Sequence, residues 1–166
     1  MKLASELFLL TQQAGVHQKG TFNLQNLIEN TKKNSDFSKA GAIAVFIGVV
    51  RGKNNERQKV VNMTLEAYEE KANETLAKIT QELTKKQGIV DVQIHHLLGE
   101  FNVGEDVVYV SVAAAHRKQA FDVLREAVER YKHEAPVFKK EKVVTAEGEE
   151  AEYWVSEKEH QPSDAA

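Results

Sequence analysis

The stretch VVYVSVAAAHRKQAF, residues 107–121, changes its hydrophobic pattern halfway along and so places a strand directly before a helix. Its first part is apolar at almost every position, which is typical of a strand buried in a sheet. Beyond His116 the chain becomes highly charged, and its apolar residues recur at helical spacing, at Phe121, Leu124, Val128 and Tyr131. The pattern predicts a buried strand followed by a long helix that packs against the sheet.

The surrounding segments predict the other strands of this sheet. Residues 40–50 are apolar on both faces of a strand, whereas residues 60–68 and 89–98 alternate between apolar and polar positions. The residues expected to share an inner face are Val61, Met63, Leu65 and Ala67 in the first alternating strand and Val90, Val92, Ile94, His96 and Leu98 in the second. A short strand is also expected around residues 152–155, and the polar residues 52–59 are expected to form a mobile loop.

Three further helices are predicted. One spans residues 69–87, with Leu76, Ile79 and Leu83 facing inward and Gly88 as its C-cap. Another begins after the capping residue Asn23 and buries Leu24, Leu27 and Ile28. The first lies near the N-terminus, with Leu3, Leu7 and Leu10 at helical spacing, and ends near Gly15. Strands and helices in this order predict an α+β fold, in which a mixed antiparallel sheet has helices against it.

The composition indicates one main domain. The chain has 166 residues, 42% of them hydrophobic and 28% charged, with a net charge of −3. That charge argues against duplex nucleic acid as a main partner, and the absence of cysteine fits a reducing, cytoplasmic location. Glu6 interrupts the early apolar run, which argues against a signal peptide. We predict an N-terminal helical extension at residues 1–20, a domain at 21–156 and a disordered tail at 157–166.

The segment YKHEAPVFKKE, residues 131–141, carries two lysines on either side of a helix end. Pro136 lacks an N–H group and restricts Ala135, so the helix must stop before it. Lys132 then lies in the last helical turn, and Lys139 projects from the chain that follows. The two ammonium groups can share a pocket that stabilises negative charge or transfers a proton, but solvated surface lysines are the commoner outcome.

Two other places offer basic side chains. His116 and Arg117 stand at the start of the long helix, where free N–H groups attract anions and a positive side chain is unfavourable unless an anion binds. Both side chains can instead turn into water or onto a carboxylate. Arg51 closes a strand, which by itself is a weak signal. His95 and His96 face opposite sides of one strand and cannot share a metal, so His96 is expected to be a core histidine.

Taken in order, several motifs resemble the catalytic subunit family of molybdopterin synthase. They are GAIAVFIGVVRG, TLEAY, HHLLGE, VGEDVVYVSVAAAHRKQAF and YKHEAPVFKKE, followed by Trp154. The resemblance runs from about Thr21 to Val155. It departs from the family at Phe138, where a tryptophan is common.

The resemblance implies an α/β-hammerhead fold and a sulfurtransferase. Members transfer sulfur from the C-terminal thiocarboxylate of a small ubiquitin-like subunit to cyclic pyranopterin monophosphate, which forms the dithiolene of molybdopterin. They act as a homodimer within a heterotetramer, and the step needs no metal or other cofactor. Matched by position, the family's catalytic lysines are Lys132 and Lys139, and its substrate-binding residues are Arg51, His116, Arg117 and Lys139. The His-Arg pair is expected to serve the site of the neighbouring copy.

Two other classes of protein remain as alternatives to this enzyme. A dimeric sensor of an anionic metabolite needs the pair at His116 and Arg117 but not the two lysines. A binder of single-stranded RNA would use the basic loop and stack bases on Tyr68, Tyr109 or Phe138. The scattered aromatic residues and the negative net charge argue against the second alternative.

Overall fold

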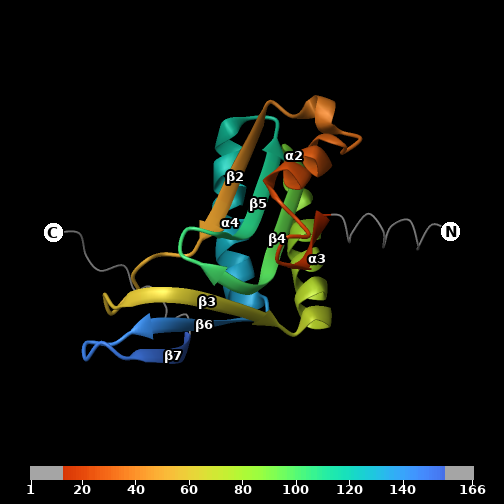
Figure 1. Cartoon of the computed structure of the whole chain (residues 1–166). Helices are drawn as coiled ribbons and strands as arrows, with labels where there is room; N and C mark the ends of the chain where they lie inside the picture. Colours follow the sequence, from red (N-terminus) through yellow and green to blue (C-terminus); the bar gives the residue numbers. More distant parts are fainter. Residues whose placement is uncertain (1–12, 156–166) are drawn as a thin grey trace.

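The computed structural model describes residues 13–155 as two groups of strands that share the long strand β4 (Figure 1). The elements are β1 (Ala14–Gln18), α2 (Leu24–Lys32), η1 (Phe37–Lys39), β2 (Ala42–Val49), β3 (Lys59–Ala67), α3 (Glu69–Thr84), β4 (Ile89–Asn102), β5 (Asp106–Ala114), α4 (Arg117–Glu134), β6 (Val137–Val144) and β7 (Glu150–Val155). The strand order is β2-β5-β4-β3-β6-β7, with antiparallel neighbours, and β1 pairs with β4 in parallel. This mixed sheet with flanking helices confirms the predicted α+β class.

Strand β4 passes from one group of strands to the other at Gly99. It pairs with β5 as far as His96 and with β3 from Gly99 onward. Gly99 has a φ of +127°, a conformation that residues with a Cβ rarely adopt. We call β1, β2, β5 and the first part of β4 the upper sheet, and β3, β6, β7 and the end of β4 the lower sheet. The lower strands run across the foot of the upper sheet, as a hammerhead does (Figure 1).

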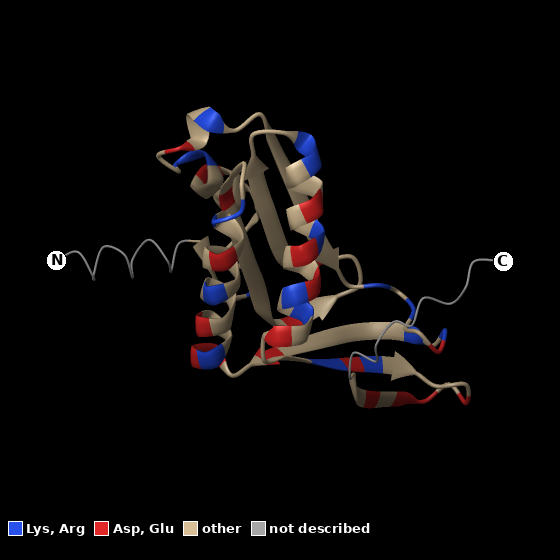
Figure 2. Ribbon diagram, turned by 180° about the vertical axis from the view of Figure 1, so that it is seen from behind, with Lys and Arg blue, Asp and Glu red and all other residues tan. Residues whose placement is uncertain are grey.

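Helices cover both faces of the upper sheet. Helices α3 and α4 lie side by side on one face, and α2 lies on the other (Figures 1 and 2). The ring of His96 meets the ring of Tyr131 from α4, with centroids 5.9 Å apart, while on the opposite face Thr31 Oγ1 of α2 lies 3.0 Å from Ser111 Oγ. Within residues 13–155, no helix is long and apolar enough to cross a membrane.

Two of the predicted helices form, with differences in their ends and core residues: the C-cap of α3 is Lys85 and not the predicted Gly88. Asn23 caps α2, because its side chain accepts a hydrogen bond from Asn26 N at 2.9 Å and its own N–H donates to Asn26 Oδ1 at 3.0 Å. Leu27 is fully buried, but Leu24 is exposed and Ile28 only half-buried. Helix α3 is shorter than the predicted range 69–87, and its inward residues Leu76, Ile79 and Leu83 are buried as predicted.

Helix α4 buries the predicted stripe except at its first residue, Phe121. Phe121 is 61% exposed, although it was expected in the core, while Tyr131 and Val128 are buried. The residues that face the sheet include Ala120, Val123 and Ala127. Small side chains in the first turns let the helix axis lie close to the strands, so the stripe rotates away from Phe121.

Three predictions that concern the strands need correction. The N-terminal helix was expected to end near Gly15, but Ala14–Gln18 form the strand β1, which pairs with β4. The main domain therefore begins before residue 21. The leucines at 3, 7 and 10 lie outside the described residues. A register shift between Val60 and Asn62 buries Val60 and leaves Val61 half-buried. Strand β6 was not predicted, because its run of lysines hides the alternation.

Candidate active site

The corner at Pro136 joins the end of α4 to the lower sheet. Ala135 caps the helix in an extended conformation, as expected before a proline, and its N–H donates to Tyr131 O at 3.1 Å. Pro136 O then accepts a hydrogen bond from Tyr68 N at 3.2 Å, and β6 begins at Val137. The predicted helix stop is therefore confirmed, and the chain turns directly from a helix into a paired strand.

The two lysines on either side of this corner differ in exposure. Lys132 lies in the last turn of α4 and is exposed, whereas Lys139 is half-buried in β6. Lys139 pairs with Leu65 of β3 and with Val155 of β7. Because side chains alternate along a strand, Lys139 shares the inner face of the lower sheet with the fully buried Val143. A cation held beside apolar side chains is less hydrated than one in open water.

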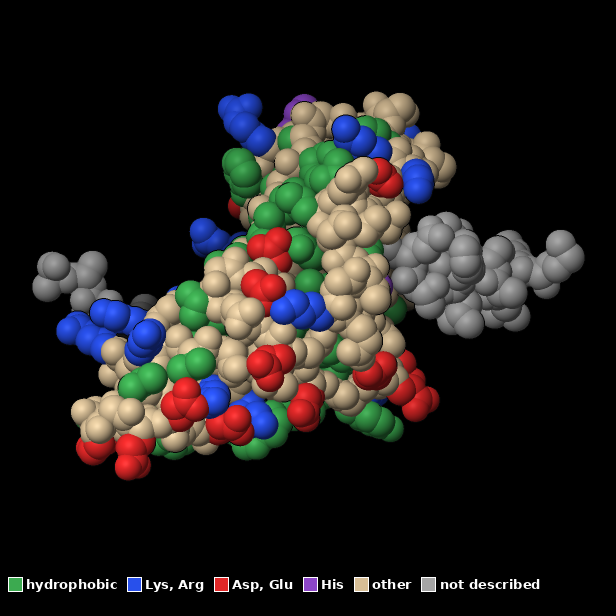
Figure 3. Space-filling view, in the orientation of Figure 1, with side chains coloured by type: hydrophobic (Ala, Val, Ile, Leu, Met, Phe, Trp, Pro, Cys, Tyr) green, Lys and Arg blue, Asp and Glu red, His purple; other side chains and the backbone are tan. Residues whose placement is uncertain are grey.

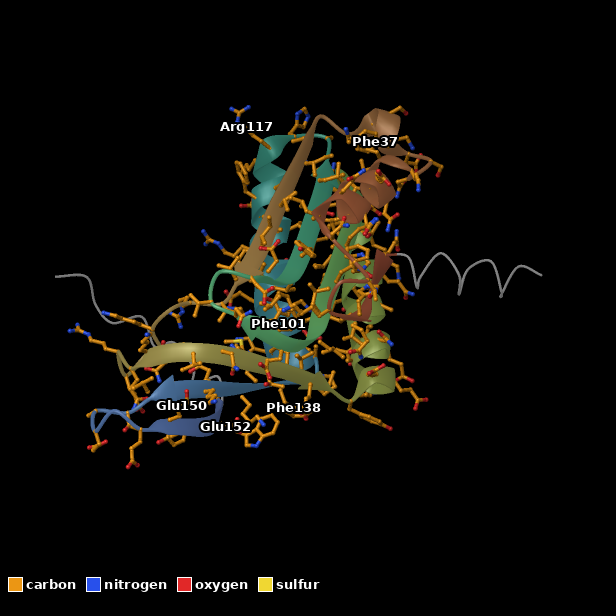
Figure 4. All side chains as sticks on the ribbon, in the orientation of Figure 1. Phe37, Phe101, Arg117, Phe138, Glu150 and Glu152 are labelled. Carbon is orange, nitrogen blue, oxygen red and sulfur yellow. The ribbon has the colours of Figure 1, made fainter. Side chains whose placement is uncertain are left out.

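Phe138 lies on the opposite face from Lys139. It pairs with Glu66, is 52% exposed, and points away from the upper sheet (Figure 4). On the same outer face Lys140 forms an ion pair with Glu152 at 3.3 Å and lies over the ring of Trp154. The residue that replaces the family's common tryptophan is therefore part of an exposed outer surface.

His116 and Arg117 stand at the other end of α4. His116 is the N-cap residue in an extended conformation, its side chain makes no capping hydrogen bond, and the first turn contains no acidic residue. Both side chains are exposed, and Arg117 projects outward beyond the upper sheet (Figure 4). At 1.5 Å per residue, this end lies about 24 Å from Lys132. One chain therefore does not bring the His-Arg pair and the lysines together.

Arg51 lies at a third position, between β2 and β3. Its guanidinium donates to Asn55 Oδ1 at 3.1 Å, and Asn54 closes the loop by accepting hydrogen bonds from Glu56 N and Gln58 N. A group of Lys and Arg side chains gathers at this end of the lower sheet (Figure 3, left). Val60 N donates to Gly52 O beside Arg51, whereas Lys139 pairs with Leu65, about 17 Å further along β3.

A buried polar row on β4 was not found from the sequence. His17 Nε2 of β1 lies 2.9 Å from His95 Nδ1, and the His95 ring stacks on Phe22 with centroids 4.0 Å apart. Burial lowers the pKa of His95 to about 3, with a further contribution from His17, and burial also lowers the pKa of His17. His95 Nε2 in turn lies 3.1 Å from Gln93 Oε1.

The polar row continues from Gln93 to Asp91. Gln93 Nε2 donates to Asp91 Oδ2 at 2.9 Å, and Asn34 Nδ2 donates to Asp91 Oδ1 at 3.1 Å. Burial raises the pKa of the Asp91 carboxyl, although these hydrogen bonds oppose the shift. On the other face His96 is buried and its Nδ1 lies 3.1 Å from Leu97 O, which confirms it as a core histidine. The strict alternation of polar and apolar residues at 91–95 was the signal for this row.

Solved structures of two bacterial proteins have this fold. The crystal structure of molybdopterin synthase from Staphylococcus aureus matches with a TM-score of 0.73 and 26% identity, over 87% of this chain and 97% of that chain. The molybdopterin biosynthesis MoaE protein from Burkholderia ambifaria matches with a TM-score of 0.67 and 31% identity, over 86% of this chain and 88% of that chain. The class is therefore that of the sulfurtransferase subunits of molybdopterin synthase.

Sequence comparison gives the family itself. Residues 17–134 match the MoaE protein family, and the chain belongs to this family. It is 37% identical to the molybdopterin synthase catalytic subunit of Pyrococcus abyssi, over 85% of this chain and 88% of that protein, and 34% identical to that of Bacillus subtilis, over 84% and 82%. A probable molybdopterin synthase of Haloferax volcanii is 35% identical over 81% of this chain, which spans half of that longer protein.

Proposed function

We propose that this chain is the catalytic subunit of a molybdopterin synthase. It takes sulfur from the C-terminal thiocarboxylate of a small ubiquitin-like protein and transfers it to cyclic pyranopterin monophosphate, in the cytoplasm. The proposal is supported by the family and, above all, by the Pro136 corner, which holds Lys132 and Lys139 on two adjoining elements. A complex of subunits 1 and 2 of the molybdopterin-converting factor from Helicobacter pylori has the same fold, which supports a two-subunit assembly.

The two lysines act on charge that develops during transfer. Acyl transfer from a thiocarboxylate builds negative charge on its carbonyl oxygen, and attack by sulfur displaces oxygen from the substrate. Lys132 lies beside the incoming thiocarboxylate and stabilises the first of these charges. Lys139, which is half-buried against apolar neighbours, lies beside the pterin. A partly dehydrated cation stabilises such charges more strongly than one in bulk water does.

The substrate phosphate is held by Arg51 together with His116 and Arg117 from a second copy of the chain. The long separation along α4 supports this arrangement, because a single copy cannot place both ends of the helix at one small substrate. The first turn of α4 offers free N–H groups and no acidic side chain, which suits a phosphate. An arginine fork adds contacts to two phosphate oxygens.

A reconstituted reaction tests the activity directly. The purified chain is mixed with a thiocarboxylated ubiquitin-like protein that ends in Gly-Gly and with cyclic pyranopterin monophosphate, and the dithiolene product is measured. We expect product only when both proteins are present. A chain that forms the two-protein complex, shown by its mass, yet yields no dithiolene would refute the proposed function and leave the anion sensor as the better reading.

A further inference from the structure

Helices α3 and α4 face each other with alternating charges spaced four residues apart. We call this set the charge ladder; its members are Lys78 and Glu82 on α3, Lys86 just beyond the C-terminal end of α3, and Glu126, Arg130 and Glu134 on α4. Arg130 Nη2 lies 2.7 Å from Glu82 Oε2, and Lys86 forms an ion pair with Glu126. The partners follow opposite chain directions, so the two helices are antiparallel. They lie side by side on one face of the upper sheet (Figure 2).

Arg130 is the most extensively bonded member of the ladder. Besides Glu82, it binds Glu134 in a two-pronged contact, with Nε 2.6 Å from Oε1 and Nη2 3.1 Å from Oε2. Its side chain is only 22% exposed, compared with 46% for Lys86. The hydrogen bonds to Glu134 are the main cause that raises the pKa of Arg130, and the same bonds lower the pKa of Glu134.

This contact fixes the last turn of α4. The turn ends at an extended Ala135 rather than at a glycine cap, and helix ends without strong caps tend to fray. Arg130 and Glu134 are four residues apart and share one side of the helix, while Lys132 is about 200° away from Arg130 and faces another direction. The contacts of Arg130 with Glu134 and Glu82 therefore hold the turn that carries Lys132 without covering Lys132 itself.

We propose that Arg130 is a positioning residue for sulfur transfer, with Glu82 of α3 as its anchor. The inference depends on the proposed role of Lys132. By tying Glu134 to α3, Arg130 sets where the last turn of α4 meets the Pro136 corner, and hence where the Lys132 ammonium group stands. A shift of about 1 Å in a charge-stabilising group is enough to slow a reaction greatly.

The test compares Arg130→Met with Lys86→Met, which removes an ion pair of the same ladder far from the corner. We expect Arg130→Met to lower kcat about tenfold with a nearly unchanged KM for the pterin, and Arg130→Lys to recover most of the loss. Lys86→Met should lower the melting temperature, as Arg130→Met does, but leave kcat unchanged. Equal effects of the two methionine variants on kcat would overturn the inference.

Two more variants keep the test decisive. Glu82→Ala removes the contact between Arg130 and α3 but leaves the contact between Arg130 and Glu134, so it remains informative if Arg130→Met fails to fold. It should also lower kcat; a wild-type kcat in Glu82→Ala would overturn the anchor role. Lys132→Ala separates this inference from the proposed function. If Lys132→Ala is inactive while Arg130→Met keeps full kcat, only the positioning role fails, whereas full turnover by Lys132→Ala removes the lysine mechanism itself.

Discussion

The two ends of α4 carry basic residues under opposite electrostatic conditions. Lys132 and His133 stand in the last turn, where the carbonyl end of the helix dipole favours cations. His116 and Arg117 stand at the first turn, where the dipole disfavours them and no side-chain cap compensates. A cation at the C-terminal end needs no ligand to explain it, but an uncapped, basic N-terminal end is unfavourable until an anion binds. Local electrostatics therefore supports a phosphate site at the start of α4. The support for a role of Lys132 and Lys139 comes instead from the turn at Pro136, which brings their two elements together.

The largest expected effect comes from the C-terminal end. Lys132→Ala and Lys139→Ala should each lower sulfur transfer by about 100-fold or more, because on the proposed mechanism each removes a charge that stabilises the transition state. Initial rates with the thiocarboxylated partner measure this loss. Lys140→Ala is the matched control, since Lys140 lies on the outer face of the same strand and pairs with Glu152. Rates that fall equally for all three lysines would contradict the assignment.

The second prediction joins the two ends across a dimer. A doubly tagged dimer, with one copy carrying Lys132→Ala and the other Arg117→Ala, has one complete site if the His-Arg pair serves the neighbour. Its turnover should then be about half of the wild-type value, because one of two symmetric sites remains. A dimer with Lys132→Ala in both copies is the inactive control. If each site used its own Arg117, the mixed dimer assayed at pterin concentrations well below KM would keep only about a twentieth of the wild-type turnover, because its one site with an intact Lys132 would bind the pterin about tenfold more weakly.

The third prediction addresses the N-terminal end alone. Arg117→Ala should weaken binding of the pterin monophosphate by about tenfold at low salt, and by less at high salt, because ions screen an exposed charge. Affinity measured over a series of salt concentrations tests this. Lys118→Ala serves as the control, since Lys118 lies in the same turn but pairs with Asp122 at 2.9 Å. An Arg117→Ala loss that stays constant across the series would argue against a phosphate there.

The smallest effect is a gain in stability. His116→Asp adds a capping side chain and a favourable charge to the start of α4, so it should raise the free energy of unfolding by about 0.5–1 kcal/mol. The same change should weaken phosphate binding, since it repels the anion. Urea denaturation and pterin affinity, measured on one protein sample, report both. A His116→Asp variant that gains no stability would show that the start of α4 is already satisfied.

Sequence reasoning located most of the elements but not all of their faces. The helix and strand periods predicted α3, β2, β4 and β5, because long apolar patterns follow from burial on a known period. Strand β6 escaped, since its lysines obscure that period and its pairing with β3 depends on distant residues. Phe121 was misplaced because the pattern does not reveal that small alanines would face the sheet.

The candidate site was predictable only in part. The helix stop at Pro136 follows from local backbone chemistry, and the structure confirms it. The roles of Arg51, His116, Arg117, Lys132 and Lys139 came from family resemblance and remain predictions. Spacing along the chain cannot test whether the two ends of α4 contribute to one site, because on the proposed arrangement that site needs a second copy.

The buried His95 of β4 and its neighbour His17 of β1 make the protein sensitive to acid. The pKa of His95 falls from 6.5 to about 3 on folding, so below about pH 6.5 the unfolded chain takes up a proton that the folded chain refuses. Stability is therefore complete above that pH and falls as the solution becomes more acidic, by up to about 1.4 kcal/mol per pH unit for this group. His17 acts in the same direction, whereas Asp91 acts in the opposite direction at pH values between its ordinary pKa of 3.8 and its raised pKa in the folded chain. Denaturation curves between pH 7.5 and 5 should show this slope, which His95→Gln should flatten. Because the contact between His17 and His95 ties β1 to the sheet, we expect mild acid to loosen β1 first.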